Sequence, residues 1–548
     1  MQNNNKEFIK DSDLVYIAPN LVSECLIDNW YAWPHLISPI TAALNIKNRH
    51  LKILNSFLLD PQSHVEAAKN PKMLGGPFIN HGKDKLPEIE KLKCDTLVEC
   101  KDLLELCDAI SELNDLLKSE ATGYSMKPLY KKIPDILKGF VELFYDLHNN
   151  PSYRFFEGLL YNSKFYKESL QSLNLFKVLD DDSRSFILST PSLPRDDKLN
   201  LKIPFKDKKI DDLFRMSTKP ESYEEIKKKF NIKEKDDKLF RSFFTKDIPQ
   251  KYINYSGSGV LTRYFGHACV LVETKHTSIL VDPVISYGYE SDISRYTYSD
   301  LPDCIDYVLI THNHQDHILL ETLIRIRYKI KNIIVPKNSG GRLQDPSLKL
   351  MFHYLGFENI IELGDMETLT FKDCSITGIP FLGEHSDLDI RSKLCYSVKL
   401  DNDFKILFAA DSCNLSPDVY KKIYKIYGKL DVIFLGMECD GAPLSWLYGP
   451  LMPDQIVRNM DQTRRLAGCN FEEGKALIEL FKPQNVFIYA MGLEPWLKYI
   501  SSIKYTKESR PIIESDMVLE YCNNLGIDSE RLFGEKIIEY NHSDEFLI

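Results

Sequence analysis

The sequence predicts a mixed α/β (α+β) protein with two domains, and three observations lead to that prediction. At 548 residues the chain is longer than one hydrophobic core normally supports. Its first part contains long segments with helical periodicity. After about residue 245, short apolar runs alternate with helical segments. We therefore expect an N-terminal mixed α/β domain over residues 1–245 and a second α/β domain over residues 246–548.

Two segments of the N-terminal part have the pattern of amphipathic helices. In residues 95–118, apolar side chains such as Leu103 and Leu106 recur at helical spacing, and residues 135–147 repeat the pattern. Residues 204–249 are rich in lysine and aspartate, which is typical of a solvated connecting region. The domain boundary is expected towards the end of that region.

Compact apolar runs rich in Val, Ile, Phe and Tyr follow the boundary and indicate buried strands. These runs cover residues 259–274, 278–285, 307–311, 332–336, 374–381, 393–400, 405–412, 431–437 and 485–492. Helical segments at 321–331, 417–428 and 471–482 lie between several of them. The alternation predicts sheets covered by helices.

Composition and charge argue against several classes of function. The net charge of -10 disfavours a protein whose main partner is the phosphate backbone of nucleic acid. The polar start MQNNNKEFIKDSD is unlike a secretory signal, and no window has the roughly 20 apolar residues of a membrane span. The 12 cysteines form no Cys-x-x-Cys pair, so we expect reduced thiols and a cytoplasmic protein.

The most informative segment is THNHQDH at residues 311–317, directly after a strand-like run. It contains three of the 13 histidines of the chain, a density that favours a metal site over hydrogen-bonded core histidines. The loops that follow strands are where α/β proteins build their sites. His312 and His314, two apart on extended backbone, can converge on one ion. Asp316 and His317 can bind a second ion about 3.5 to 4 Å away.

This His-x-His-x-Asp-His segment resembles that of the metallo-β-lactamase superfamily, over roughly residues 255–500. The resemblance implies an αββα sandwich with metals at one edge. Asp282 ends what looks like the opening hairpin, where the superfamily has a residue that orients the metal-binding loop; a simple turn explains Asp282 equally well. Glu384 and His385 stand where a further ligand is expected, and Asp411 stands where a carboxylate bridges the two metals.

The remaining histidines separate two chemistries. Dinuclear hydrolases of the superfamily usually have another histidine some tens of residues after the bridging aspartate, but after His385 this chain has only His542, in a polar tail. If His385 binds metal, the site resembles a zinc hydrolase. If Glu384 binds instead, the ligands include three carboxylates, Glu384, Asp316 and Asp411, which favour a redox-active iron pair. Zinc has no redox chemistry for such a site to use.

Four segments, HNHQDH, GEHSDLDIRSKLCYSV, AADSC and YAMGLEPWL, together with a large N-terminal domain, resemble a narrower family. This family is the diiron amino-acid β-hydroxylases of nonribosomal peptide biosynthesis, of the chloramphenicol-pathway type. The resemblance implies that residues 1–245 mediate dimerisation and shape the substrate entrance, and that residues 246–548 form a metallo-β-lactamase-fold catalytic domain with two iron ions. The metal ligands that it implies are His312, His314, Asp316, His317, Glu384 and Asp411.

The same resemblance implies a substrate and partners. The substrate would be an amino acid held as a thioester on the phosphopantetheine arm of an aminoacyl carrier protein, the thiolation domain of a nonribosomal peptide synthetase. One oxygen atom of O2 would enter the β C–H bond, so an external electron donor, and hence a redox partner, would be required. A homodimer is expected, and neither nucleic acid nor membrane is expected as a partner.

Residues outside the ligand set are also candidates for roles in the site. Glu438 could assist proton delivery as a catalytic residue, although a helix cap or a solvated acid is at least as good an interpretation. Trp446 and Tyr448 could line the substrate channel or simply pack. Other candidates are His267 as support for the metal loop, Arg458, Arg464 and Arg465 as a surface for an acidic carrier, and Glu494 and Trp496 facing the cleft.

Two other classes of function compete with the oxygenase hypothesis. A zinc-dependent hydrolase of the same fold would act on a phosphodiester, lactone or thioester through His385 and a metal-bound hydroxide. The absent late histidine counts against it. A noncatalytic scaffold with a structural metal is the third class, but structural sites are usually closed and mononuclear.

Overall fold

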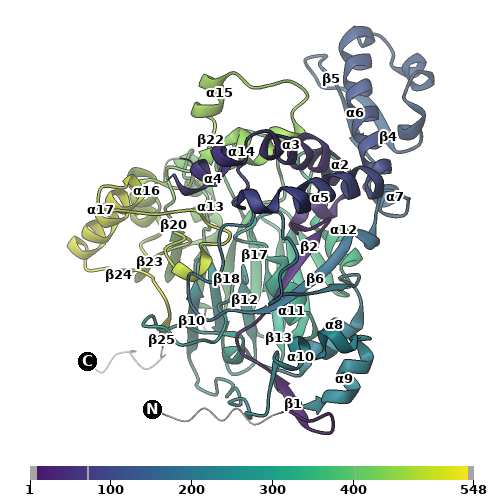
Figure 1. The fold of residues 1–548 in the computed structure, drawn as a ribbon. Helices are drawn as coiled ribbons and strands as arrows, with labels where there is room; N and C mark the ends of the chain where they lie inside the picture. The colour runs from purple at the N-terminus through teal and green to yellow at the C-terminus, as the bar shows by residue number, and fades with distance from the viewer. Residues whose placement is uncertain (1–8, 71–72, 74, 401–402, 541–548) are drawn as a thin grey trace, which may run out of the picture.

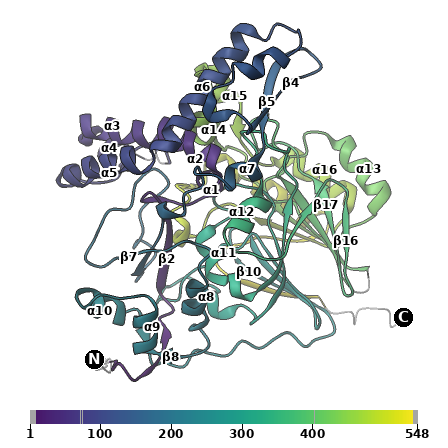
Figure 2. The same ribbon diagram turned by 90° about the vertical axis from the view of Figure 1, so that its right-hand side faces the viewer.

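The computed structural model describes residues 9–70, 73, 75–400 and 403–540. Its C-terminal part is a sandwich of two seven-stranded sheets (Figures 1 and 2). The first sheet has the order β15 (Ile360–Leu363), β14 (Ile330–Pro336), β13 (Ile305–Leu309), β12 (Ser278–Val281), β11 (Cys269–Glu273), β10 (Val260–Gly266) and β25 (Lys536–Tyr540). The second has the order β16 (Thr368–Thr370), β17 (Ser375–Pro380), β18 (Leu394–Lys399), β19 (Lys405–Phe408), β20 (Val432–Gly436), β23 (Asn485–Tyr489) and β24 (Asp528–Arg531).

Both sheets combine antiparallel and parallel pairs. In the first sheet, β12 to β15 are parallel neighbours. In the second, β19, β20, β23 and β24 are parallel. The inner faces form one apolar core, in which Val270 and Leu309 of the first sheet belong to the same cluster as Phe408 and Phe434 of the second. Such strands read as continuous apolar runs because both of their faces are buried.

Helices cover the outer faces and complete the αββα order. The second sheet packs against α13 (Pro417–Tyr427), α16 (Phe471–Phe481) and α17 (Arg510–Asn524). On the first sheet lie α11 (Leu320–Ile326) and α12 (Leu348–Tyr354). The predicted strands and the predicted helices at 417–428 and 471–482 are therefore confirmed. The helix predicted at 321–331 is shorter than expected, because α11 ends at Ile326 and β14 begins at Ile330.

The N-terminal part contains a four-stranded sheet, a three-stranded sheet, a hairpin and several helices. The larger sheet has the order β3 (Trp30–Tyr31), β2 (Leu21–Ile27), β6 (Gln171–Lys177) and β7 (Leu199–Lys202). The smaller one has the order β8 (Glu221–Ser222), β1 (Leu14–Ile17) and β9 (Phe244–Thr245). The helices include α1 (Pro34–Ile37), α2 (Pro39–Asn45), the π-turn η1 (Ile46–His50), α3 (Leu51–Leu59), α4 (Pro61–Lys69), α5 (Leu86–Glu99), α6 (Lys101–Glu120) and α7 (Glu157–Tyr161).

Two expectations for this part need correction. Residues 95–118 belong to two helices, α5 and α6, because the chain leaves helical geometry at Cys100. Residues 135–147 are not an amphipathic helix; they contain β4 (Val141–Tyr145), which forms an antiparallel hairpin with β5 (Pro151–Phe155). Ile136, Phe140 and Phe144 recur every four residues as in a helix, but they belong to a 3-10 turn, a connecting turn and a strand, which periodicity over so short a segment does not distinguish.

The expected connecting region is folded. Residues 204–249 contain α8 (Lys208–Arg215), α9 (Tyr223–Lys229) and α10 (Glu234–Arg241), and β9 returns to pair with β1. Their lysines and aspartates lie mainly on outer faces, while buried aromatic side chains such as Phe214 and Phe240 hold the helices to the core. The domain boundary between residues 1–245 and 246–548 stays a prediction. The strand β9 ends at Thr245, the last residue before that predicted boundary.

A buried ionic network joins the N-terminal part to the sandwich. Glu321, in the first turn of α11, accepts hydrogen bonds from both terminal nitrogens of Arg184 at 2.8 and 2.9 Å. The hydroxyls of Tyr31 and Tyr287 donate to the same carboxylate. Arg184 also stacks over the ring of Tyr499, 3.6 Å from its centroid. The network fixes the connector between β6 and β7 against the helix that follows the predicted metal loop.

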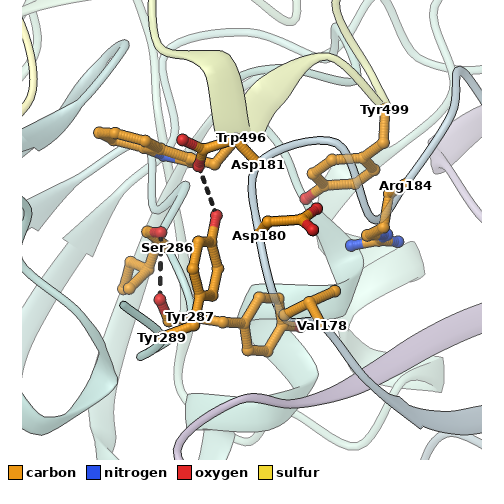
Figure 3. Close-up of a pocket in the computed structure, with 10 residues that line it drawn as sticks. Val178, Asp180, Asp181, Arg184, Ser286, Tyr287, Tyr289, Trp496 and Tyr499 are labelled. Carbon is orange, nitrogen blue, oxygen red and sulfur yellow. Dashed lines mark hydrogen bonds between the residues drawn. The ribbon is translucent and has the colours of Figure 1, made fainter. Parts of the chain in front are cut away.

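Figure 3 shows a small cavity of about 20 Å³ at this junction, lined in part by Arg184, Tyr287 and Tyr499. Asp181, on the same connector, accepts a hydrogen bond from the Tyr289 hydroxyl at 2.6 Å and from Arg295 at 2.7 Å. None of the predicted metal ligands lines this cavity, so it is part of the domain junction and not of the site.

Two further expectations concern the whole chain. No disulfide joins cysteines of the described residues, and most of these thiols are buried. Among the helices of the described residues, none is both long and apolar enough to cross a membrane.

Candidate metal centre

The candidate residues gather at one edge of the sandwich, in loops that follow strands. Asp282 follows β12, and the segment His312–His317 follows β13. Glu384 follows β17, and Asp411 follows β19. Because parallel neighbours present their carboxyl ends at the same edge, residues far apart in the chain converge there. His542 lies outside the described residues.

Asp282 holds two of the histidines in defined tautomers. Its carboxylate, fully buried, lies 2.8 Å from His317 Nδ1 and accepts hydrogen bonds from the backbone N–H and the hydroxyl of Thr311. The Thr311 hydroxyl donates a hydrogen bond to Asp282, so its oxygen is left to accept a hydrogen bond from His312 Nδ1–H at 3.0 Å. Both histidines therefore present an unprotonated Nε2 to the site, which is the arrangement that metal binding requires. The orienting role expected of Asp282 is consistent with these contacts.

One group of ligand atoms comes from His312, His314 and Glu384, all buried and mutually within 4.8 Å. His314 Nδ1 lies 2.7 Å from Glu384 Oε1, and His314 Nε2 lies 3.1 Å from the hydroxyl of Tyr448. His314 thus turns Nδ1 towards the other ligands, while Tyr448 fixes its outer nitrogen.

A second group comes from His312, His317 and Asp411, and a third from His267, Asp316 and His317. His317 Nε2 and His312 Nε2 lie 3.1 and 3.9 Å from Asp411 Oδ2. Asp411 is therefore placed between the two halves of the site, as a bridging carboxylate would be.

His267 supports Asp316. Its Nδ1 accepts a hydrogen bond from the backbone N–H of Gly492, so the proton of the neutral ring is on Nε2, 3.3 Å from Asp316 Oδ2. Although burial raises the pKa of the Asp316 carboxyl, His267 and His317 hold it well below its usual range. The geometry thus agrees with a supporting role for His267.

Several buried atoms at this edge have no hydrogen-bond partner within the described residues. They include His312 Nε2, His317 Nε2 and Asp411 Oδ1, whereas Glu384 Oε2 lies 2.7 Å from His385 Nδ1. Buried polar atoms are normally satisfied, and a convergent set that is not requires another partner. Unprotonated imidazole nitrogens and carboxylate oxygens fit divalent iron or zinc. The residues present therefore fit a pair of metal ions.

Glu384 and His385 occupy different positions relative to this set. Glu384 adopts a left-handed backbone conformation with φ of +62°, which directs its carboxylate towards His314. Although burial raises the pKa of Glu384, His314 and His385 hold it well below its usual range. His385 stacks on His314 with ring centroids 4.4 Å apart, and it belongs to none of the ligand groups found among the described residues.

Glu438 follows β20 and lines the same cavity as Glu384 and Asp411. Its Oε1 accepts hydrogen bonds from the backbone N–H groups of Asp440 and Gly441, whereas its buried Oε2 has no partner among the described residues. Burial raises the pKa of Glu438 to about 7. A carboxyl with these properties can hold a proton near neutral pH.

Comparison with known proteins relates this geometry to a family. Residues 16–248 match the model described as the diiron non-heme β-hydroxylase N-terminal domain, and residues 277–444 match a β-lactamase superfamily domain. A relative from Streptomyces venezuelae is 37% identical over 525 residues, which cover 94% of this chain and 98% of the relative. The chain belongs to the diiron non-heme β-hydroxylase family.

That relative is named 4-amino-L-phenylalanyl-[CmlP-peptidyl-carrier-protein] 3-hydroxylase. Among solved structures, the crystal structure of CmlA, a diiron β-hydroxylase from S. venezuelae, matches with a TM-score of 0.89 at 36% identity, and the match covers 96% of this chain and 99% of the other. A variant of CmlA matches with a TM-score of 0.87. The αββα fold with a separate N-terminal domain is thereby confirmed, and family membership implies two iron ions and O2.

The β-hydroxylase has a cavity of about 800 Å³ that reaches His314, Asp316, Glu384, Asp411 and Glu438. Its wall includes the expected Trp446, but Tyr448 is buried behind His314 and is not a lining residue. Much of the remaining wall comes from N-terminal residues that the sequence did not single out. They are Asn48, Arg49, Lys52, Ile53, Ser56, His64, Gly75, Pro77, Phe78, Phe186, Leu188 and Ser189.

The other expected residues are dispersed. Arg464 donates to the backbone carbonyl of Ser386 in the Glu384 loop, and Arg465 lines the cavity. Glu494 accepts a hydrogen bond from Tyr264, and Trp496 lines the small junction cavity. Glu494 and Trp496 therefore do not face the metal cavity, because the chain after β23 turns them towards the sandwich core and the domain junction.

Proposed function

We propose that this β-hydroxylase inserts one oxygen atom of O2 into the β C–H bond of an amino acid held as a thioester on a carrier protein. The observation that carries the proposal is the set of unpartnered nitrogen and carboxylate oxygen atoms at the end of a cavity large enough for a ligand. The match of nearly the whole chain to a relative named as a carrier-bound aminoacyl 3-hydroxylase supports it.

We assign the metal ligands as His312, His314 and Glu384 for one iron, Asp316 and His317 for the other, and Asp411 as the bridge. Three carboxylates favour iron over zinc. When bound, the iron pair would supply the reduction of O2 and the oxidising power for C–H cleavage. The position of Glu384 against His314, with His385 outside the ligand groups, supports Glu384 as the ligand.

The protein's own residues would bind, orient and protonate. Asp282 and Thr311 fix the histidine tautomers, and His267 and Tyr448 hold Asp316 and His314 from outside. Glu438, with a free Oε2 in the cavity, would hold or deliver a proton. The tether would matter through proximity, since it holds the β carbon in the cavity.

The partners follow from the same proposal. An aminoacyl carrier protein, the thiolation domain of a nonribosomal peptide synthetase, would deliver the substrate, and a redox partner would supply electrons from an external donor. We also propose a cytoplasmic homodimer formed through residues 1–245. In both views the hairpin β4–β5 and the adjoining end of α6 project from the body (Figures 1 and 2). Exposed Tyr124 and Leu147 lie in this projecting part.

Mass spectrometry of aminoacyl carrier proteins tests the reaction. Iron-loaded protein is reduced, exposed to O2 and mixed with carriers that hold different amino acids. A hydroxylase leaves the acyl group attached and heavier by one oxygen atom, and labelled O2 transfers its isotope. Release of the acyl group without oxygen incorporation would instead indicate a zinc-type hydrolase and would contradict the proposal.

A further inference from the structure

Both carboxylates and cations line the cavity. The sandwich contributes the carboxylates Asp316, Glu384, Asp411 and Glu438. The N-terminal part contributes the cations Arg49 and Lys52. A metal pair would compensate the carboxylates, but it would not compensate these two cations.

Arg49 and Lys52 lie on one face of a continuous helical segment, η1 followed by α3. The cavity-lining residues of this segment, Asn48, Arg49, Lys52, Ile53 and Ser56, recur at the spacing of a single helix face. Arg49 belongs to the π-turn, a feature often found at functional sites. Asn48 donates to the carbonyl of Pro450 at 2.9 Å, and Arg49 donates to the carbonyl of Trp446. These bonds fix the segment against α14 (Leu444–Tyr448) and the turn η9 (Gly449–Leu451), and Tyr448 of α14 contacts His314.

Neither cation is within 4.0 Å of a carboxylate in the described part of the chain. On the same turn, Lys47 pairs with Asp108, so the segment is not simply remote from acids. Arg465, the third lining cation, donates to the carbonyls of Asp440 and Gly441. Burial lowers the pKa of the Arg49 guanidinium to about 10, so it stays charged at neutral pH. Arg49 is therefore a desolvated cation with one neutral partner, which is costly unless an anion completes its bonding, whereas Lys52 is exposed.

We propose that Arg49 and Lys52 form an oxyanion-binding subsite of the substrate cavity. Resting on the proposed function, the subsite takes either the phosphate of the carrier arm or a carboxylate of the tethered acyl group. Both offer oxygens that match the planar donor fork of arginine. The subsite would anchor the ligand on the part of the cavity wall that comes from the N-terminal residues.

Equilibrium binding to the metal-loaded full-length protein tests the subsite without turnover. Calorimetry compares two pairs of probes that differ in one charged group: phosphopantetheine with pantetheine, and succinyl-pantetheine with butyryl-pantetheine. We expect one charged member to bind about 10- to 100-fold more tightly than its neutral partner, as for one or two charge-assisted hydrogen bonds. The pair that shows the preference identifies the phosphate or the carboxylate as the anion.

Variants assign the preference to the two side chains. Arg49→Gln with Lys52→Gln should abolish it, Arg49→Lys should retain part of it, and the control Lys47→Gln, on the same turn but outside the cavity, should leave it unchanged. No preference in either pair, or a preference that survives Arg49→Gln with Lys52→Gln, would overturn the proposal, since the anion would then bind the metals or another surface. The binding experiment uses neither O2 nor a reductant. Its outcome therefore does not depend on whether the protein hydroxylates any aminoacyl carrier.

Discussion

Replacing Asp282 by asparagine should disable the iron site of His317. Asp282 Oδ2 lies against both the Thr311 hydroxyl at 2.5 Å and His317 Nδ1 at 2.8 Å, while Oδ1 accepts from the Thr311 N–H. An asparagine keeps one acceptor oxygen and places an N–H2 group at the other position. If the asparagine oxygen accepts from the Thr311 N–H, the asparagine N–H2 group faces His317 Nδ1 and donates a hydrogen bond to it. The proton of His317 must then be on Nε2, which faces Asp411.

The expected magnitude follows from the bonds that are lost. A residue that hydrogen-bonds the outer nitrogen of a metal-bound histidine typically contributes about 10- to 100-fold to metal affinity. Leaving a buried donor unsatisfied costs about 1–3 kcal/mol in folding stability. Asp282→Asn should therefore retain about one iron per chain under conditions where the wild type retains two, and the metal-free variant should be only moderately destabilised.

The assay is iron content after dialysis against a graded chelator, together with thermal unfolding of metal-free and metal-loaded protein. Asp211→Asn is the matched control, because Asp211 is a buried aspartate that pairs with Arg327 away from the site. The control should lower stability and retain both irons. Two irons bound to Asp282→Asn with wild-type affinity would refute the role given to Asp282.

Three further predictions concern protons and the domain junction. Glu438 is protonated below about pH 7, so hydroxylation that needs its proton should fall as pH rises through 7. In a plot of kcat against pH, Glu438→Gln should remove this fall. A plot unchanged by Glu438→Gln would exclude Glu438 as the proton donor. Burial raises the pKa of Asp28 from 3.8 to about 7, so its contribution to stability is present at low pH and lost as pH rises through 7. Asp28→Asn should flatten the dependence of urea unfolding on pH between about 4 and 7, the range between the two pKa values. Arg184→Met leaves Glu321 buried without its cation and should lower the free energy of unfolding by about 3–5 kcal/mol. The double variant Arg184→Met with Glu321→Gln should recover most of this loss. A double-mutant cycle of urea unfolding measures both effects.

The sandwich could be predicted from the sequence because its strands are buried on both faces and form unbroken apolar runs, such as the one containing Phe434. The ligand segment from His312 to His317 was predictable because its ligands are adjacent in the chain. The choice between Glu384 and His385 was not predictable. It depends on the left-handed backbone at Glu384 and on the position of His314, and neither leaves a pattern in the sequence.

The N-terminal wall of the cavity was beyond prediction for a different reason. Arg49, Phe78 and Phe186 come from separate segments with no common motif, and they meet only in the folded structure, where contacts such as the bond of Arg49 to the Trp446 carbonyl hold them in place. The Lys- and Asp-rich helices up to Thr245 resemble a solvated connector in the sequence because their charges are exposed, while the apolar residues that hold them are widely spaced. A composition average hides such spacing.

Anomalous diffraction from crystals of the aerobically purified protein, recorded across the iron and zinc absorption edges, tests the central claim most directly. The account predicts two iron peaks bridged by Asp411, with Glu384 bound to the iron of His312 and His314 and with His385 unbound. Zinc peaks bound by His385, with Glu384 turned away, would contradict it.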